Sequence, residues 1–240
     1  MSTNRFPALL QGFFLNRLMT QRNASPATVR AYRDTFRLLL RYLEQTHHGM
    51  RASDVTVDML TADTILAFLT DLEVTRHNSI KTRNHRLAAI HSFMDYVGFE
   101  APEYLAIIQR VKQIPFKKAQ SRVVSYLLPE EMEALLAVCA VETWLGRRDR
   151  LMLALLYNTG IRVSELVSLA YDSVLQTPSG VQTLRIWGKG RKERVLPLWR
   201  NTQEYVADWM RERGGAGQDE LFSNCRGEGL TRSGVTARLK

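Results

Sequence analysis

Two short stretches of the sequence decide the fold: GIRVSELVSL, residues 160–169, and IWGKGRKERVLPL, residues 186–198. In the first, Arg162 follows a glycine suited to end one helix and stands where the next helix begins, so two packed elements should hold it. A guanidinium is charged at any accessible pH and can bind two oxygens of one phosphate. The alternative is a structural ion pair with a nearby acid such as Glu165 or Asp172.

The second stretch predicts a β-hairpin, or the edge of a small antiparallel sheet, around Lys189. Over residues 183–198, apolar residues flank the polar turn Gly188-Lys189-Gly190, and glycines tolerate the positive φ angles that tight turns need. A lysine at the tip of such a hairpin can reach into a DNA groove. The cations that follow it are placed to meet backbone phosphates: Arg191, Lys192 and Arg194. Taken alone, the same residues could form a solvated basic turn.

Upstream of these stretches, residues 6–111 have helical periodicity throughout, with glycine and proline confined to the joints. Three helices are predicted to begin after the N-caps Ser25, Thr61 and Ser79. The first and third of these helices have basic side chains that we expect to meet phosphates or a major groove: Arg30, Arg33, Arg37, Arg41, Lys81, Arg83 and Arg86. The alternative is that these side chains form an ordinary solvated helix surface.

The segment KQIPFKKAQSR, residues 112–122, has a proline, clustered lysines and little periodicity, so it reads as a linker. We therefore expect a helical domain over residues 1–111, a linker over 112–124 and a second domain over 125–240. The second domain should contain a helix from Pro129, an apolar helix that ends at residues 158–160, a short helix over 163–169, the hairpin, a helix over 202–213 and a further helix from Thr231.

The composition favours a polyanionic partner. The 240 residues include 33 Lys and Arg against 24 Asp and Glu, which gives a net charge of +9 and a pI near 9.8, and such a charge binds nucleic acid through counterion release. The two cysteines, Cys139 and Cys225, have no partners at metal-ligand spacing, so neither a disulfide framework nor a zinc module is expected. No signal peptide pattern or membrane span is found, and a cytoplasmic location is expected.

Together, Gly-Ile-Arg-x-Ser-Glu-Leu and Gly-Lys-Gly-x-Lys-x-Arg-x-x-Pro-Leu resemble the motifs of the tyrosine recombinases, the family of phage and transposon integrases and Xer-type resolvases. The likeness extends along the chain, because residues 28–32 and 83–93 are similar to the helical core-binding domain of that family. Residues 220–235, ELFSNCRGEGLTRSGV, resemble the strand and turn that precede its later motifs.

The resemblance implies a mainly α fold, in which a SAM-like helical core-binding domain is joined to an α-rich catalytic domain with a small antiparallel β-sheet. It implies that Arg162 is the first catalytic arginine and Lys189 the hairpin lysine. The implied reaction is attack by a tyrosine on a phosphodiester of double-stranded DNA, which needs neither a metal nor another cofactor. The implied assembly is a homo-oligomer on DNA, a tetramer in the family.

The family pattern is incomplete in this sequence. A His-x-x-Arg motif and the tyrosine nucleophile would follow residues 231–239, but the sequence given ends at Lys240 and its histidines all lie in the first half: His47, His48, His77, His85 and His91. Tyr157, Tyr171 and Tyr205 are interpreted as packing residues. The expectation is a C-terminally incomplete catalytic domain that binds DNA but does not cut it alone.

Three alternatives remain open from the sequence. The chain could be a non-catalytic DNA-binding protein on the same fold, such as a repressor or plasmid-maintenance factor. It could be a metal-dependent phosphate hydrolase that uses Arg162, although no cluster of acidic and histidine residues supports that reading. It could also be an unstable fold, if absent helices leave apolar surface exposed.

Overall fold

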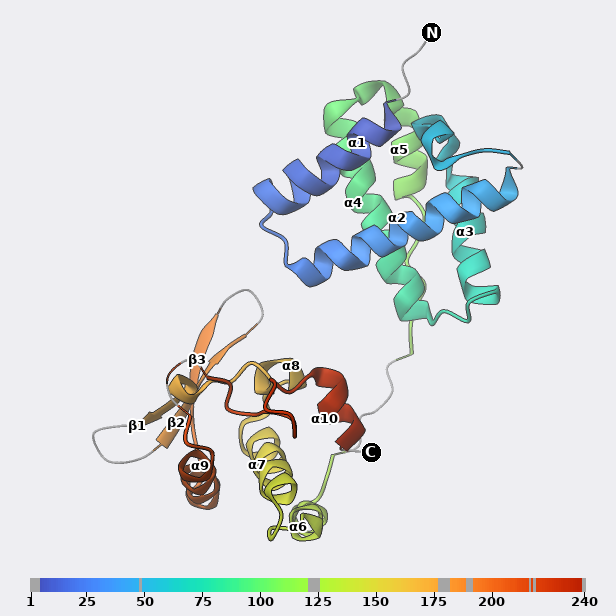
Figure 1. Ribbon diagram of the computed structural model, residues 1–240. Helices are drawn as coiled ribbons and strands as arrows, with labels where there is room; N and C mark the ends of the chain where they lie inside the picture. Colours follow the sequence, from blue (N-terminus) through green and yellow to red (C-terminus); the bar gives the residue numbers. More distant parts are fainter. Residues whose placement is uncertain are drawn as a thin grey trace. The chain divides into compact units, whose positions relative to one another are not determined.

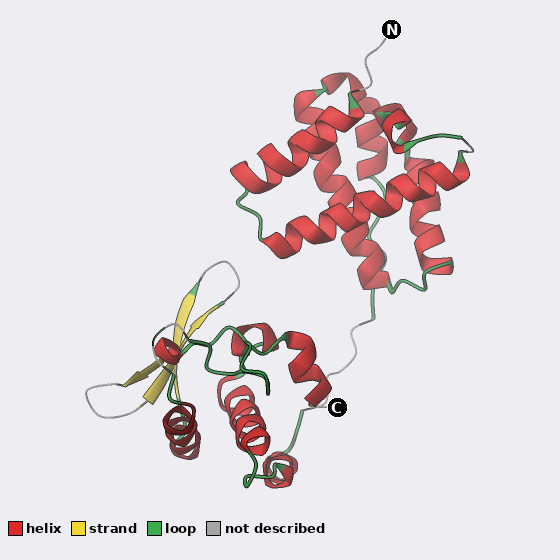
Figure 2. Cartoon of the chain, viewed as in Figure 1, coloured by secondary structure: helices red, strands yellow, loops and turns green. Residues whose placement is uncertain are grey.

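The computed structural model describes residues 5–47, 49–120, 126–176, 182–188, 192–215, 217 and 219–238. The chain divides into two units, Met1–Val123 (unit 1) and Val124–Lys240 (unit 2), drawn in Figure 1. Each unit has its own cluster of buried apolar side chains. The described part of unit 1 consists of helices and loops, whereas unit 2 also contains strands (Figure 2).

Unit 1 is built from helices joined by short connections. In chain order they are α1 (Phe6–Gly12) and its π-helical continuation η1 (Phe13–Gln21), α2 (Pro26–Thr46), the 3-10 turns η2 (Ala52–Asp54) and η3 (Val57–Met59), α3 (Ala62–Val74), α4 (Ile80–Glu100), the 3-10 turn η4 (Pro102–Tyr104) and α5 (Leu105–Lys112).

The three predicted N-caps of unit 1 are confirmed. The hydroxyl groups of Ser25, Thr61 and Ser79 each accept a hydrogen bond from the backbone amide three residues later, at 3.2, 3.2 and 3.3 Å. Each bond satisfies an amide that has no partner inside the helix. Local sequence signals therefore fix where α2, α3 and α4 begin.

Aromatic rings form the centre of unit 1. The ring of Phe93 on α4 makes edge contacts with Phe6, Phe13 and Phe36, at centroid distances of 5.9, 5.5 and 5.1 Å. All four side chains are at most 2% exposed. Because these rings come from α1, η1, α2 and α4, their contacts hold α1, η1 and α2 around α4.

His91 on α4 is buried, and its Nε2 lies 3.0 Å from the carbonyl oxygen of Val111. The edge of its ring meets Phe116, at a centroid distance of 5.5 Å. Burial lowers the pKa of the His91 imidazole; the bond to Val111 opposes that shift, and nearby Lys112 adds to it. The folded protein therefore takes up a proton at His91 less readily than the unfolded chain does.

Unit 1 should lose stability as the pH falls through about 6.5, the pKa of an unperturbed histidine, towards the lower folded pKa. Above that window the imidazole is neutral in both states, and the free energy of unfolding should level off. We expect His91→Gln, which keeps a donor for Val111 and cannot titrate, to reduce the loss between pH 7.5 and pH 5.5. Urea unfolding followed by far-ultraviolet circular dichroism measures both proteins. An equal loss in the variant would assign the effect to another group.

Unit 2 combines helices with a small sheet. Its elements are α6 (Pro129–Val138), α7 (Trp144–Thr159), α8 (Val163–Leu166), the 3-10 turn η5 (Tyr171–Ser173), β1 (Val174–Gln176), β2 (Gln182–Trp187), β3 (Glu193–Pro197), α9 (Arg200–Arg213) and α10 (Arg232–Arg238). The strands form an antiparallel sheet in the order β1-β2-β3. In Figure 1 the sheet lies to one side of α7 and α10 to the other.

The predicted hairpin is confirmed, with Ile186 opposite Arg194 and Trp187 opposite Glu193. The small antiparallel sheet was expected, but the position of its edge strand β1 was not, because three residues are too few to show an alternating pattern. Helix α8 ends at Leu166, short of the predicted 169, and there the Ser168 hydroxyl donates to the carbonyl of Glu165 at 2.8 Å. A side-chain bond of this kind competes with continuation of the helix.

The core of unit 2 lies between α7, α9 and the inner face of the sheet. Leu155, Leu184 and Trp209 are at most 2% exposed, and the indole N–H of Trp209 donates to the carbonyl of Leu221 at 2.8 Å. Helix α7 packs along α9. In the part of the chain that the structure describes, no helix combines the length and the apolar character that crossing a membrane requires.

Candidate functional site

Arg162 is held between two helices, as the sequence predicts. Gly160 ends α7 in the left-handed conformation, with φ of 60°, a geometry that glycine adopts without strain. Arg162 follows with an extended backbone and is the N-cap of α8. The residues beside it, Ile161 and Leu166, are buried, yet the Arg162 side chain is 64% exposed. A fixed backbone therefore presents this guanidinium to solvent.

Glu165 lies at the centre of the site, with a side chain that is 6% exposed. Its Oε2 accepts a hydrogen bond from the Arg162 amide at 2.9 Å, and its Oε1 accepts one from Nη1 of Arg162, also at 2.9 Å. Nη2 of Arg194, on β3, donates to the same Oε2 at 2.8 Å. One buried carboxylate thus contacts two arginines that are far apart in the sequence.

The charge of Glu165 is maintained by these contacts. Burial alone would raise the pKa of the Glu165 carboxyl, but the amide and guanidinium of Arg162 and the guanidinium of Arg194 outweigh it and lower that pKa. The carboxylate is therefore ionised at neutral pH. We call Arg162, Glu165 and Arg194 the charged trio. Two cations and one anion leave the trio with a net positive charge, which suits an anionic ligand.

Gly188 lies directly beside the trio. A Cβ at this position would lie 3.1 Å from Nη1 of Arg194, so a larger residue would crowd that guanidinium, and it would lie at an ordinary contact distance of 3.5 Å from Oε1 of Glu165. The amide of Gly188 donates to the carbonyl of Lys192 at 2.8 Å and closes the base of the hairpin. Lys189 and Arg191 lie outside the described residues, so the convergence of Lys189 with Arg162 stays a prediction.

A second cationic surface lies on α2. Arg30, Arg33, Arg37 and Arg41 recur at intervals of three and four and are all exposed, so they form one stripe on the helix. This basic stripe extends for about 16 Å at 1.5 Å per residue. Only its Arg37 has an ion pair among the contacts of the described residues, with Asp34 at 3.6 Å. Lys81, at the start of α4, is also exposed.

Two of the basic residues that were predicted to contact DNA make hydrogen bonds within unit 1. Arg83 is 3% exposed, and its Nη1 donates to the carbonyl of Pro115 at 3.0 Å. Nη1 of Arg86 donates to the carbonyl of Ala31 at 3.1 Å and to the Thr35 hydroxyl at 3.0 Å. Arg83 does not fit an exposed phosphate contact, and Arg86 joins α4 to α2. Helix α4 is covered on several sides, so its periodicity did not reveal which basic residues point inwards.

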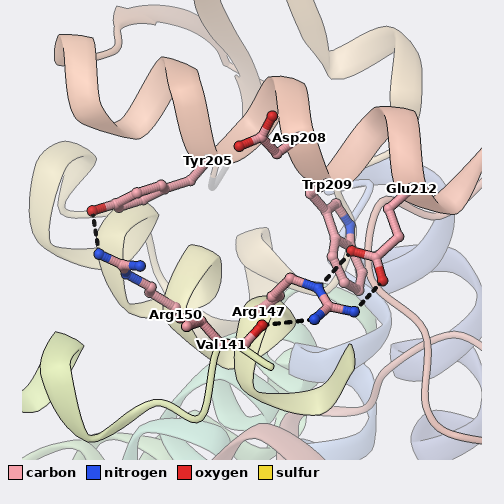
Figure 3. Close-up of a pocket in the computed structure, with 7 residues that line it drawn as sticks. All are labelled: Val141, Arg147, Arg150, Tyr205, Asp208, Trp209 and Glu212. Atoms are coloured by element: carbon pink, nitrogen blue, oxygen red, sulfur yellow. Dashed lines mark hydrogen bonds and ion pairs between the residues drawn. The ribbon is translucent and has the colours of Figure 1, made fainter. Parts of the chain in front are cut away.

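The three tyrosines considered from the sequence make packing contacts. Tyr171 is buried, and the edge of Tyr157 meets Trp199 at a centroid distance of 5.4 Å. Arg150 donates from Nη2 to the Tyr205 hydroxyl at 2.8 Å, and its guanidinium lies 4.4 Å from the centre of the Tyr205 ring. Figure 3 shows this hydroxyl turned towards Arg150.

Tyr205 and Arg150 belong to a cavity of about 210 Å³ between α7 and α9 (Figure 3). The other arginine in its wall, Arg147, already binds both carboxylate oxygens of Glu212, at 2.7 and 2.5 Å. Arg147 is ion-paired, Arg150 is bonded to Tyr205, and the carboxylates of Asp208 and Glu212 also line the cavity. This cavity therefore offers less for an anion than the charged trio does.

Two family models match the chain. The model described as phage integrase, N-terminal SAM-like domain, matches residues 12–98, and the model described as phage integrase family matches residues 125–240. The integrase/recombinase y4rC of Sinorhizobium fredii is 44% identical over 231 residues, which are 96% of this chain and 69% of that protein. Tyrosine recombinase XerC of Staphylococcus haemolyticus is 32% identical over 203 residues, 85% of this chain and 64% of that protein.

Solved structures show the same fold. A lambda integrase tetramer bound to a Holliday junction matches with a TM-score of 0.69 at 15% identity, over 97% of this chain and 63% of that chain. XerH recombinase bound to a palindromic difH substrate matches with a TM-score of 0.63 at 20% identity, over 88% of this chain and 61% of that chain. The chain therefore spans a little under two thirds of each of these solved chains.

Proposed function

The chain belongs to the phage integrase family of tyrosine recombinases, and we propose that it binds duplex DNA and holds Arg162 against the phosphate at which a strand is exchanged. In this proposal the basic stripe of unit 1 contacts backbone phosphates, and unit 2 supplies part of the catalytic site. The single observation that supports it best is Arg162 itself, whose backbone is fixed between α7 and α8 while its side chain is 64% exposed.

Arg162 would act on charge that develops during the reaction. When a tyrosine hydroxyl attacks a phosphodiester, the non-bridging oxygens gain negative charge in the transition state, and a fixed guanidinium stabilises that state more than the ground state. The bond between Arg162 and buried Glu165 keeps the guanidinium in place before DNA arrives. Lys189 would donate a proton to the leaving 5′-oxygen, as an amine on a hairpin beside phosphates can do.

We further propose that these 240 residues alone bind DNA without forming a covalent link. Tyr171 is buried, and the Tyr205 hydroxyl is bonded to Arg150, so burial and this bond argue against either residue as the nucleophile. The lambda integrase neighbour is a tetramer on its junction, and self-association on DNA is the corresponding expectation for this chain.

Salt dependence tests the binding proposal. We expect the affinity for a fluorescein-labelled duplex of about 30 base pairs to fall at least about 100-fold between 50 and 200 mM KCl, as counterion release predicts for several phosphate contacts. Fluorescence anisotropy measures the affinity. An affinity that does not change over this range would contradict an electrostatic interface. A protein–DNA adduct that survives SDS would contradict the absence of covalent chemistry in these residues.

A non-catalytic DNA-binding protein would use the same basic stripe but would not need Arg162 to face a phosphate. The variant Arg162→Gln separates the two functions. If the site is used as proposed, the slope of log affinity against log salt should become shallower by about one, the effect of losing one phosphate contact. An unchanged slope would favour the non-catalytic alternative.

A further inference from the structure

We infer that Arg194 is a positioning residue that shares the Glu165 carboxylate and thereby leaves Arg162 free to bind a phosphate. The inference rests on the proposed function, because it assigns a role within the same site. It differs from the expectation from sequence, in which Arg194 is itself a phosphate contact.

The first reason is the charge requirement of Glu165. An ionised carboxylate that is 6% exposed is costly unless a cation and hydrogen bonds compensate it. If Arg162 were the only cation present, its guanidinium would be drawn into a two-point pair with Glu165, the geometry that arginine and carboxylate prefer. A guanidinium held in this way would have to give up those bonds before it could bind a phosphate.

The second reason is how the contacts are divided. Arg194 approaches both oxygens of Glu165, with Nη2 at 2.8 Å from Oε2 and Nη1 at 3.5 Å from Oε1. Arg162 makes one side-chain contact with Glu165, from its Nη1 to Oε1 at 2.9 Å. The Arg162 side chain is 64% exposed, whereas that of Arg194 is 36% exposed. Arg194 is therefore the more enclosed counter-ion of Glu165, and Arg162 keeps donors that face solvent.

The third reason is the position of Arg194 in the sheet. It lies opposite Ile186, which is 1% exposed, so Arg194 projects from the inner face of β3. Its guanidinium lies against Gly188 and Glu165. A phosphate contact would require the side chain to leave both, whereas its present position links the base of the hairpin to α8.

A double-mutant cycle tests the inference with the labelled duplex. We expect Arg194→Gln to make the salt slope shallower by about one, like Arg162→Gln, because Glu165 then captures Arg162. In a Glu165→Gln background, Arg194→Gln should leave the slope unchanged, since no carboxylate remains to capture Arg162. An equal loss of slope in both backgrounds would show that Arg194 binds DNA itself and would overturn the inference.

Arg185→Gln is the matched control for lost charge. Arg185 lies on β2 and pairs with Asp172 at 3.5 Å, away from Glu165. Whatever its effect on the slope, we expect that effect to be the same in the presence and absence of Glu165→Gln. Rescue of the Arg185 variant by Glu165→Gln would mean that the cycle reports overall charge, and it would count against the inference.

A second measurement needs neither DNA nor a change at Glu165. Phenylglyoxal modifies accessible arginines, and peptide mass spectrometry gives the rate at Arg162. We expect Arg194→Gln to slow modification of Arg162 by about threefold, the size of a partly exposed ion pair, and Arg194→Lys to restore it. An unchanged rate would overturn the inference even if Glu165→Gln does not fold.

If the modification rates change as expected but Arg162→Gln leaves the salt slope unchanged, the proposed function fails and the positioning role stands.

Discussion

Replacing Arg30, Arg33, Arg37 and Arg41 together by glutamine should weaken duplex binding by about 1,000-fold near 0.1 M salt, since each phosphate contact there is worth nearly one power of ten. The four side chains are exposed on one stripe of α2, whereas Phe36, Leu39 and Leu43 of the same helix are buried. The substitution therefore removes charge without touching the core. Fluorescence anisotropy over a series of KCl concentrations gives both the affinity and its salt slope.

The matched control is lysine at the same four positions. Lysine keeps the charge and loses the fork geometry of arginine, so most of the non-specific affinity should remain. A further control, Arg51→Gln with Arg110→Gln, removes exposed charge elsewhere on unit 1 and should have a much smaller effect. If the control pair weakened binding as much per charge as the stripe variant, net charge alone would explain binding.

Gly146→Ala should destabilise unit 2 by about 3 kcal/mol, at the upper end of the usual cost of overpacking. A Cβ at Gly146 would lie far inside van der Waals contact with the backbone carbonyl of Ala140. That carbonyl accepts hydrogen bonds from the amide and the hydroxyl of Thr143, the N-cap of α7. The clash must therefore displace either the loop around Ala140 or the first helical turn of α7. Helix α7 is the one that ends just before Arg162.

Tryptophan fluorescence measures this effect selectively, because all four tryptophans, Trp144, Trp187, Trp199 and Trp209, belong to unit 2. The control is Gly98→Ala on α4, where a Cβ would meet Ile108 at an ordinary 3.5 Å. That variant should leave the fluorescence transition unchanged. A Gly146→Ala protein that unfolds at the same urea concentration as the parent would contradict this prediction. It would show that the start of α7 shifts with little loss in the free energy of unfolding.

Much of this fold could be predicted because its signals are local. Each of three helices begins at a hydroxyl side chain that accepts a bond from the amide three residues later, namely Ser25, Thr61 and Ser79. Helix α7 ends at Gly160, whose positive φ angle is typical of a glycine at a helix end. The hairpin followed from alternation around a glycine turn. Each of these features depends on a few consecutive residues, and a single sequence displays them.

The features that sequence reasoning missed depend on distant partners. Glu165 was considered only as a counter-ion for Arg162, and its second arginine lies 29 residues later on β3. Arg83 was expected to be an exposed cation, but it is 3% exposed and donates to the carbonyl of Pro115, 32 residues later. In both cases the partner is about 30 residues away in the sequence and is brought close only by folding. The periodicity of a single helix therefore cannot predict the contact.

A crystal structure of the chain on duplex DNA would test the central claim most directly, through the distance from Arg162 to the nearest phosphate. We predict that a guanidinium nitrogen of Arg162 lies about 2.9 Å from a non-bridging phosphate oxygen, a normal hydrogen bond, while Arg194 remains on Glu165. A complex in which DNA lies against unit 2 but Arg162 contacts only Glu165, or in which Arg194 has moved to the phosphate instead, would contradict it.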